Sequence, residues 1–133
     1  MSGYLLDTNA LLLLGLAPEA APPATLARLT EEPRFVSQVC AIEIAIKHSI
    51  GKLSLPLPFQ TNFAHAFREM ARELSADILD IDLGHIAALN HLPLHHRDPF
   101  DRLIIAQAVN DDLTIVTRDR TFAAYPGLDL LWI

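Results

Sequence analysis

Five short apolar segments recur along the chain, and none alternates cleanly between apolar and polar residues. Strands with this pattern are buried on both faces, as in parallel sheets that are covered by helices. We therefore expect strands over residues 3–6, 34–37, 78–81, 113–117 and 128–133. Because parallel strands need long crossover connections, this feature limits the chain to folds in which strands alternate with helices.

Helical segments are predicted between these strands. Ser37 and Gly51 are suited to begin and end one helix, and residues 59–74 carry apolar side chains at helical spacing. The expected helices cover residues 8–16, 23–30, 38–50, 59–74, 84–91, 98–110 and, as one or two turns, 119–124. Parallel crossovers are right-handed, so the pattern predicts an α/β fold: a three-layer α/β/α sandwich with a mostly parallel central sheet, in a single domain over residues 1–133.

Composition excludes several classes of protein. The 133 residues are 51% hydrophobic, which provides a core and excludes a disordered chain. The formal net charge of −6 excludes a protein that coats nucleic acid through overall positive charge. The single cysteine, Cys40, excludes an internal disulfide, and we expect it to be a small buried hydrophobic residue.

The longest apolar run, residues 10–17, is too short to cross a bilayer, which takes about 20 residues. It also lacks the preceding basic residues of an export signal. We therefore expect a cytoplasmic protein without a membrane partner.

Acidic residues gather where a parallel sheet would bind a ligand. Such sheets bind ligands at the carboxyl ends of their strands, and Asp7 and Asp119 follow predicted strands. Glu43, Asp98 and Asp101 lie on predicted helices that begin at the same edge. The sequence therefore predicts that five acids approach one another at this edge.

Ordinary explanations exist for most of these acids. Helix capping explains three of them: Asp7, Asp98 and Asp119. Glu43 precedes Lys47 at i, i+4 spacing and can pair with it, although a carboxylate among isoleucines is costly to bury. Capping explains Asp101 less well, because its side chain is shorter than the Glu of a capping box.

A cluster of carboxylates needs a cation or raised pKa values, because like charges repel. Oxygen ligands select Mg²⁺ or Mn²⁺ rather than zinc. The adjacent His95 and His96 are predicted to lie in a polar loop, with metal binding as the alternative. We therefore expect a hard divalent ion held by carboxylates.

Four groups of residues carry a family resemblance. They are Leu-Leu-Asp-Thr-Asn over 5–9, Ile-Glu-Ile-Ala-Ile-Lys over 42–47 with Gly-Lys-Leu over 51–53, His-Arg-Asp-Pro-Phe-Asp-Arg over 96–102 with Ala-Gln-Ala over 106–108, and Val-Thr-Arg-Asp over 116–119 with Phe122. In this order and spacing they resemble the PIN domain, and in particular the VapC-type toxin ribonucleases of bacterial toxin–antitoxin pairs. The resemblance covers essentially the whole chain, and one departure is Ile42, where relatives often carry Trp.

The resemblance implies an endoribonuclease that hydrolyses RNA with Mg²⁺ or Mn²⁺. It implies four catalytic acids: Asp7, Glu43, Asp101 and Asp119. Asp7 and Asp101 are the implied metal ligands, and Asp98 is auxiliary. Thr8 and Asn9 are further auxiliary candidates, with helix capping as the alternative.

The resemblance also implies partners: an RNA substrate and a VapB-like antitoxin. Residues 11–14 are four successive leucines, which predicts a homodimer contact, an antitoxin contact or a helix buried on several sides. Four arginines flank the acids, and we expect them to bind RNA: Arg97, Arg102, Arg118 and Arg120.

Two other functions are alternatives to the nuclease. One is a non-catalytic PIN-like binding module whose acids act only as helix caps. The other is a phosphotransferase with a nucleophilic aspartate, which is disfavoured because Asn9 stands where a second aspartate is often found.

Overall fold

A five-stranded parallel sheet forms the centre of the computed structural model, which describes residues 2–133. The strands are ordered β3-β2-β1-β4-β5, with β1 (Tyr4–Leu6), β2 (Arg34–Ser37), β3 (Ala76–Leu79), β4 (Thr114–Thr117) and β5 (Leu130–Trp132). Leu6 at the end of β1 aligns with Val36 of β2 and with Val116 of β4. The predicted strands are therefore confirmed, with shifts of one or two residues at their ends.

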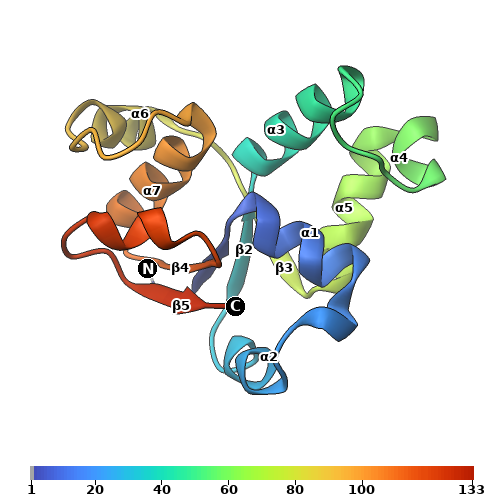
Figure 1. Cartoon of the computed structure of the whole chain (residues 1–133), viewed down its shortest axis with the longest axis horizontal. Helices are drawn as coiled ribbons and strands as arrows, with labels where there is room; N and C mark the ends of the chain where they lie inside the picture. Colours follow the sequence, from blue (N-terminus) through green and yellow to red (C-terminus); the bar gives the residue numbers. More distant parts are fainter. Residues whose placement is uncertain (1) are drawn as a thin grey trace.

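Helices lie on both sides of this sheet. They are α1 (Thr8–Leu16), α2 (Pro23–Leu29), α3 (Gln38–Ser49), α4 (Leu57–Thr61), α5 (Phe63–Glu73), α6 (Leu83–Asn90) and α7 (Pro99–Asp111), with short 3-10 helices η1 (Pro18–Ala20) and η2 (Arg120–Ala124). Figure 1 shows α6 and α7 above β4 and β5, and α1, α3, α4 and α5 to the right of β2. The predicted three-layer α/β/α architecture is confirmed, and the sheet is parallel throughout.

The prediction of one helix over residues 59–74 is wrong, because α4 and α5 are separate helices. Asn62 lies between them with an extended backbone, and its side chain accepts a hydrogen bond from the His65 N–H at 3.1 Å. Asn competes in this way with helical hydrogen bonding. The apolar spacing nevertheless spans both helices, because Phe63 of α5 packs on Phe59 of α4 and on Phe67 of its own helix.

The core lies between the sheet and the helices. Cys40 is fully buried among apolar side chains, as predicted. Leu11 and Leu14 are buried, and Leu12 and Leu13 are half-buried against the same core, so α1 is packed on several sides. Within residues 2–133, no helix has both the length and the apolar composition that crossing a membrane requires.

Candidate active site

Asp7 is buried at the carboxyl end of β1, with only 2% of the residue exposed. Its Oδ1 caps α1 by accepting the Ala10 N–H at 2.8 Å, and its Oδ2 accepts the Thr117 hydroxyl at 2.5 Å. Burial raises the pKa of Asp7 more than these hydrogen bonds lower it, and the charges of Asp119 and Glu43 raise it further.

Glu43 lies on α3, where its carboxylate is buried and its partner Lys47 is half-exposed. Lys47 Nζ lies 2.5 Å from Glu43 Oε2, and the Thr8 hydroxyl donates to Oε1 at 2.6 Å. The pairing with Lys47 is as predicted, but the carboxylate is inside the protein, with 5% of the side chain exposed. The Lys47 pKa is raised chiefly by the hydrogen bond to Glu43, with smaller contributions from the charges of Asp98 and Asp101.

Asp98 and Asp101 stand at the start of α7. Asp98 Oδ1 accepts the N–H groups of Phe100 at 2.9 Å and of Asp101 at 3.2 Å, which confirms it as the helix cap. The pKa of Asp101 is raised to about 7. Burial is the largest cause, and the negative charges of four acids contribute as well: Asp98, Glu43, Asp7 and Asp119. Asp101 is thus the carboxyl group at which the electrostatic repulsion of the other four acids converges.

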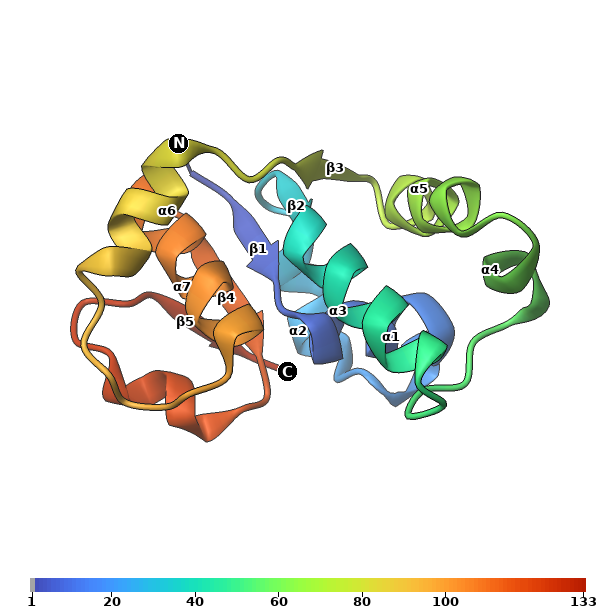
Figure 2. The ribbon, with the colours of Figure 1, turned by 90° about the horizontal axis from the view of Figure 1, so that it is seen from above.

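Asp119 follows β4 and caps η2. Its Oδ1 accepts from the Thr121 N–H at 3.0 Å and from the Thr121 hydroxyl at 2.8 Å. Its own N–H donates at 3.0 Å to Thr117 Oγ1, the hydroxyl that donates to Asp7. Thr117 therefore connects the acids that follow β1 and β4. These strands pair in parallel, so both end at the same edge of the sheet, whose arrangement can be followed in Figure 2.

The donor set fits a hydrated divalent ion rather than a closed metal cage. In the described part of the chain, no three Asp, Glu, His or Cys side chains stand close enough together to enclose a metal. Mg²⁺ is usually held through one or two carboxylates and keeps several of its waters. Burial and, to a smaller extent, the charges of four nearby acids raise the pKa of Asp101, and these acids provide the negative charge that such an ion needs.

The other predicted site residues lie in different surroundings. Asn9 is exposed at the start of α1. Three of the four arginines are exposed as well: Arg97, Arg118 and Arg120. Arg102 donates to the Pro93 carbonyl oxygen at 2.9 Å, and the Arg120 guanidinium lies 4.1 Å from the Trp132 ring centroid. The last two side chains thus make contacts within the protein.

Three residues at this site were not singled out as functional from the sequence. Thr117 joins Asp7 to Asp119, His96 lies next to Asp101, and Tyr125 contacts His96. The motif over residues 96–102 contained a signal for His96. Tyr125 reaches the site because it follows η2, and Thr117 reaches it because β4 pairs with β1.

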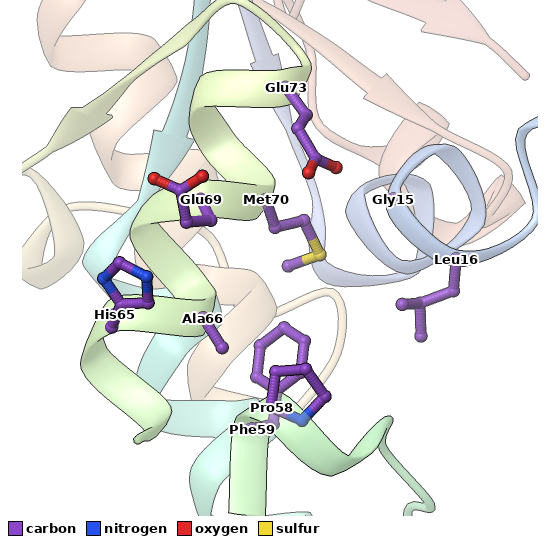
Figure 3. Close-up of a pocket in the computed structure, with 9 residues that line it drawn as sticks. All are labelled: Gly15, Leu16, Pro58, Phe59, His65, Ala66, Glu69, Met70 and Glu73. Atoms are coloured by element: carbon purple, nitrogen blue, oxygen red, sulfur yellow. The ribbon is translucent and has the colours of Figure 1, made fainter. Parts of the chain in front are cut away.

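A cavity of about 350 Å³ lies away from these acids, between α1, α4 and α5 (Figure 3). Its apolar lining includes Leu16, Phe59 and Met70, and Glu69 and Glu73 stand on its α5 side. Its lining contains none of the predicted catalytic acids, so the cavity is separate from the candidate active site.

Comparison with solved structures shows the same fold in other proteins. The chain has the same fold as the solved structure of VapBC2 from Rickettsia felis bound to a promoter DNA fragment, at TM-score 0.70 and 18% identity over 99% of this chain and 98% of that one. DNA-bound VapBC from Salmonella typhimurium matches at TM-score 0.71 and 20% identity, over 99% of this chain and 98% of that one. FitAcB from Neisseria gonorrhoeae matches at TM-score 0.64 and 21% identity, over 96% of each chain.

Comparison with curated protein sequences gives no match. The PIN domain pattern, in contrast, matches residues 4–128, which include the five strand-edge and helix-start acids. The chain belongs to the PIN domain family.

Proposed function

We propose that this chain is a VapC-like toxin nuclease, a metal-dependent endoribonuclease that hydrolyses phosphodiester bonds in RNA. The observation that carries the proposal is the convergence of four other acids on Asp101 at the carboxyl edge of the sheet of a PIN domain. Solved structures of the same fold are described as VapBC complexes, and this supports a toxin with a VapB-like antitoxin as its partner.

Asp7 and Asp101 would hold Mg²⁺ or Mn²⁺, since both come from elements that end or begin at this edge. When bound, such an ion neutralises phosphate charge and lowers the pKa of water. Glu43 and Asp119 complete the acidic site, and one of them serves as the base that takes a proton from the attacking water. Thr8 holds Glu43 Oε1, which leaves this carboxylate in one orientation.

The chain's own cations contact the RNA in this proposal. Arg97, Arg118 and Arg120 are exposed and can meet phosphates, with Arg120 stacked on Trp132, whereas the half-buried Arg102 acts from a position held by Pro93. The homodimer and the cytoplasmic location remain predictions from the sequence.

The test is RNA cleavage by the purified chain with Mg²⁺ and after EDTA. We expect cleavage that EDTA stops and that Asp101→Asn abolishes in a folded protein. Asp77→Asn is the matched control, because Asp77 is an exposed acid on β3. Cleavage that persists without metal, or that survives Asp101→Asn, contradicts the proposal.

A non-catalytic binding module is the second candidate, and one observation favours it. Three of the acids do cap helices: Asp7, Asp98 and Asp119. Capping does not explain Glu43 or Asp101, whose side chains cap no helix among the described elements. A wild-type chain that binds RNA without cleaving it, in Mg²⁺ and in Mn²⁺, would establish this second function.

A further inference from the structure

His96 precedes α7 in a loop, yet its side chain is largely buried. Only 15% of it is exposed, and its ring packs against those of Phe122 at 5.8 Å and Tyr125 at 5.5 Å between centroids. The prediction of a polar loop holds for the backbone, but this histidine is not solvated as a loop residue would be. The neighbouring His95 is exposed and provides a contrast.

The two ring nitrogens of His96 have different surroundings. Nδ1 lies 2.7 Å from the hydroxyl of Tyr125, which is itself buried. Nε2 is buried and has no hydrogen-bond partner within residues 2–133. The carboxylate oxygen Oδ2 of Asp101 lies 3.6 Å from it, just beyond hydrogen-bond range. A buried polar nitrogen without a partner is rare and destabilises the folded state, so it calls for a functional explanation.

The neighbours of His96 select one tautomer of the neutral ring. When Asp101 is ionised, a bare Nε2 lone pair facing its Oδ2 would be repelled, whereas an Nε2–H is attracted to it. The Tyr125 hydroxyl then donates to the unprotonated Nδ1 and fixes the ring orientation. The Nε2–H is thereby directed at Asp101 Oδ2, 3.6 Å away.

We propose that His96 is a positioning residue whose Nε2–H orients the Asp101 carboxylate, with Tyr125 holding the His96 ring in place. The inference rests on the proposed function, in which Asp101 is a metal ligand. Hydrogen bonds to ligating carboxylates set their orientation, and losing such a partner typically costs about 10–100-fold in metal affinity or activity. His96 does not touch RNA in this proposal and acts only through Asp101.

The first test is independent of metal and of activity. Imidazole ¹⁵N–¹H NMR spectra of the metal-free chain above neutral pH report the tautomer of each histidine, and His96→Gln assigns the signal. We expect His96 to be fixed as the Nε2–H tautomer and its Nε2 signal to shift in Asp101→Asn. An Nδ1–H tautomer, or the tautomer average expected for the exposed His95, would overturn the proposal.

The second test is Mn²⁺ titration together with RNA cleavage kinetics. We expect His96→Leu to weaken Mn²⁺ binding about 10–100-fold and to lower kcat while leaving KM for RNA unchanged. His96→Gln retains an N–H donor and restores most of both, and Tyr125→Phe gives a smaller loss. His91→Leu is the control, because His91 is an exposed histidine that follows α6, and it leaves both unchanged.

A double mutant separates positioning from a general packing role. In the Asp101→Asn background, His96→Leu should have no further effect on Mn²⁺ binding, because the group it acts through is already changed. Thermal melts in EDTA check that each variant is folded. If His96→Leu is not folded, His96→Gln is compared with the wild type in its place.

The outcomes distinguish this inference from the proposed function. If the wild type binds Mn²⁺ and cleaves RNA but His96→Leu equals it, the positioning role is overturned and the nuclease stands. If the wild type neither binds Mn²⁺ nor cleaves, the nuclease proposal fails, and the NMR spectra still decide whether His96 holds Asp101.

Discussion

At the scale of single residues, burial of acids next to other acids is the dominant feature of the site. Asp7 and Glu43 are 2% and 4% exposed, and each carboxylate is held by a hydroxyl, from Thr117 and from Thr8. Among the described residues, no hydroxyl donates to Asp101 in this way. Burial and repulsion together raise the pKa of Asp101 to about 7. The metal-free site therefore stores repulsion that a cation would relieve.

Asp101→Asn should stabilise the metal-free chain above neutral pH. The Asp101 pKa is about 7 in the folded state against 3.8 ordinarily, so the folded chain binds an extra proton between these values and loses stability as pH rises toward 7. We expect a gain of about 1–3 kcal/mol at pH 8, reduced by partial exposure of the carboxyl group. Urea unfolding in EDTA at about pH 5 and pH 8 measures it.

Asp77→Asn is the control for this measurement and should follow the wild-type pH dependence, because Asp77 is exposed on β3. An Asp101→Asn chain that is no more stable than the wild type at the higher pH would show that the repulsion is absent.

Asp7→Asn should separate capping from catalysis. Its amide oxygen still accepts the Ala10 N–H, so the free energy of unfolding should change by no more than about 1 kcal/mol. Cleavage should fall about 100-fold or more, because a metal site contributes several kcal/mol to transition-state stabilisation. Single-turnover cleavage and thermal melts of the same preparation measure the two effects, and unchanged cleavage would leave Asp7 a cap alone.

At the scale of elements, the starts of two helices bring the acids to the strands. α3 and α7 are capped by Ser37 and Asp98, and Ser37 also donates to the buried Gln107 of α7 at 2.5 Å. This bond ties the end of β2 to α7 and thereby sets Glu43 and Asp101 on facing helices. The helices α4 and α5, in contrast, pack on one another and α5 packs on the edge strand β3, and neither carries any of the predicted site residues.

Asn62→Ala should therefore lower stability without altering cleavage. The Asn62 side chain caps α5 through the His65 N–H, and losing such a cap costs about 1 kcal/mol. Chemical denaturation measures the loss, and kcat for RNA should stay at the wild-type value. Asn62→Asp retains the acceptor and serves as the control; a fall in kcat for the alanine variant would link α5 to the site.

At the scale of the whole molecule, charge is distributed unevenly on an acidic protein. The net charge is −6, yet four of the ten basic residues flank the acids in sequence: Arg97, Arg102, Arg118 and Arg120. In the proposed function RNA is held over a small area by these few cations. Non-specific binding should then be weaker than for a basic protein of the same size.

The salt dependence of RNA binding tests this distribution. With cleavage blocked by Asp7→Asn, we expect a shallow slope of log affinity against log salt, which falls by about 1 when Arg118→Ala removes one phosphate contact. Arg28→Ala on α2 is the control and should leave the slope unchanged, because Arg28 pairs with Glu31. A slope that is indifferent to Arg118 would place RNA elsewhere on the surface.

The sequence was sufficient for the order of strands and helices along the chain. Apolar runs mark the parallel strands, and Ser37, Asp98 and Asp119 mark helix starts, since propensity and capping depend on nearby residues. The break at Asn62 was missed, because three phenylalanines continue the apolar spacing across two helices.

Contacts between distant segments were decided only by the tertiary structure. Thr117 reaches Asp7 across 110 positions because β1 and β4 are neighbours in the sheet, and local pattern does not reveal which strands pair. His96 is buried against Asp101 because η2 places Tyr125 over its ring. The sequence by itself thus determined which acids and elements are available, and packing determined their burial, their pKa values and the side chains that orient them, because desolvation and repulsion depend on distances between remote residues.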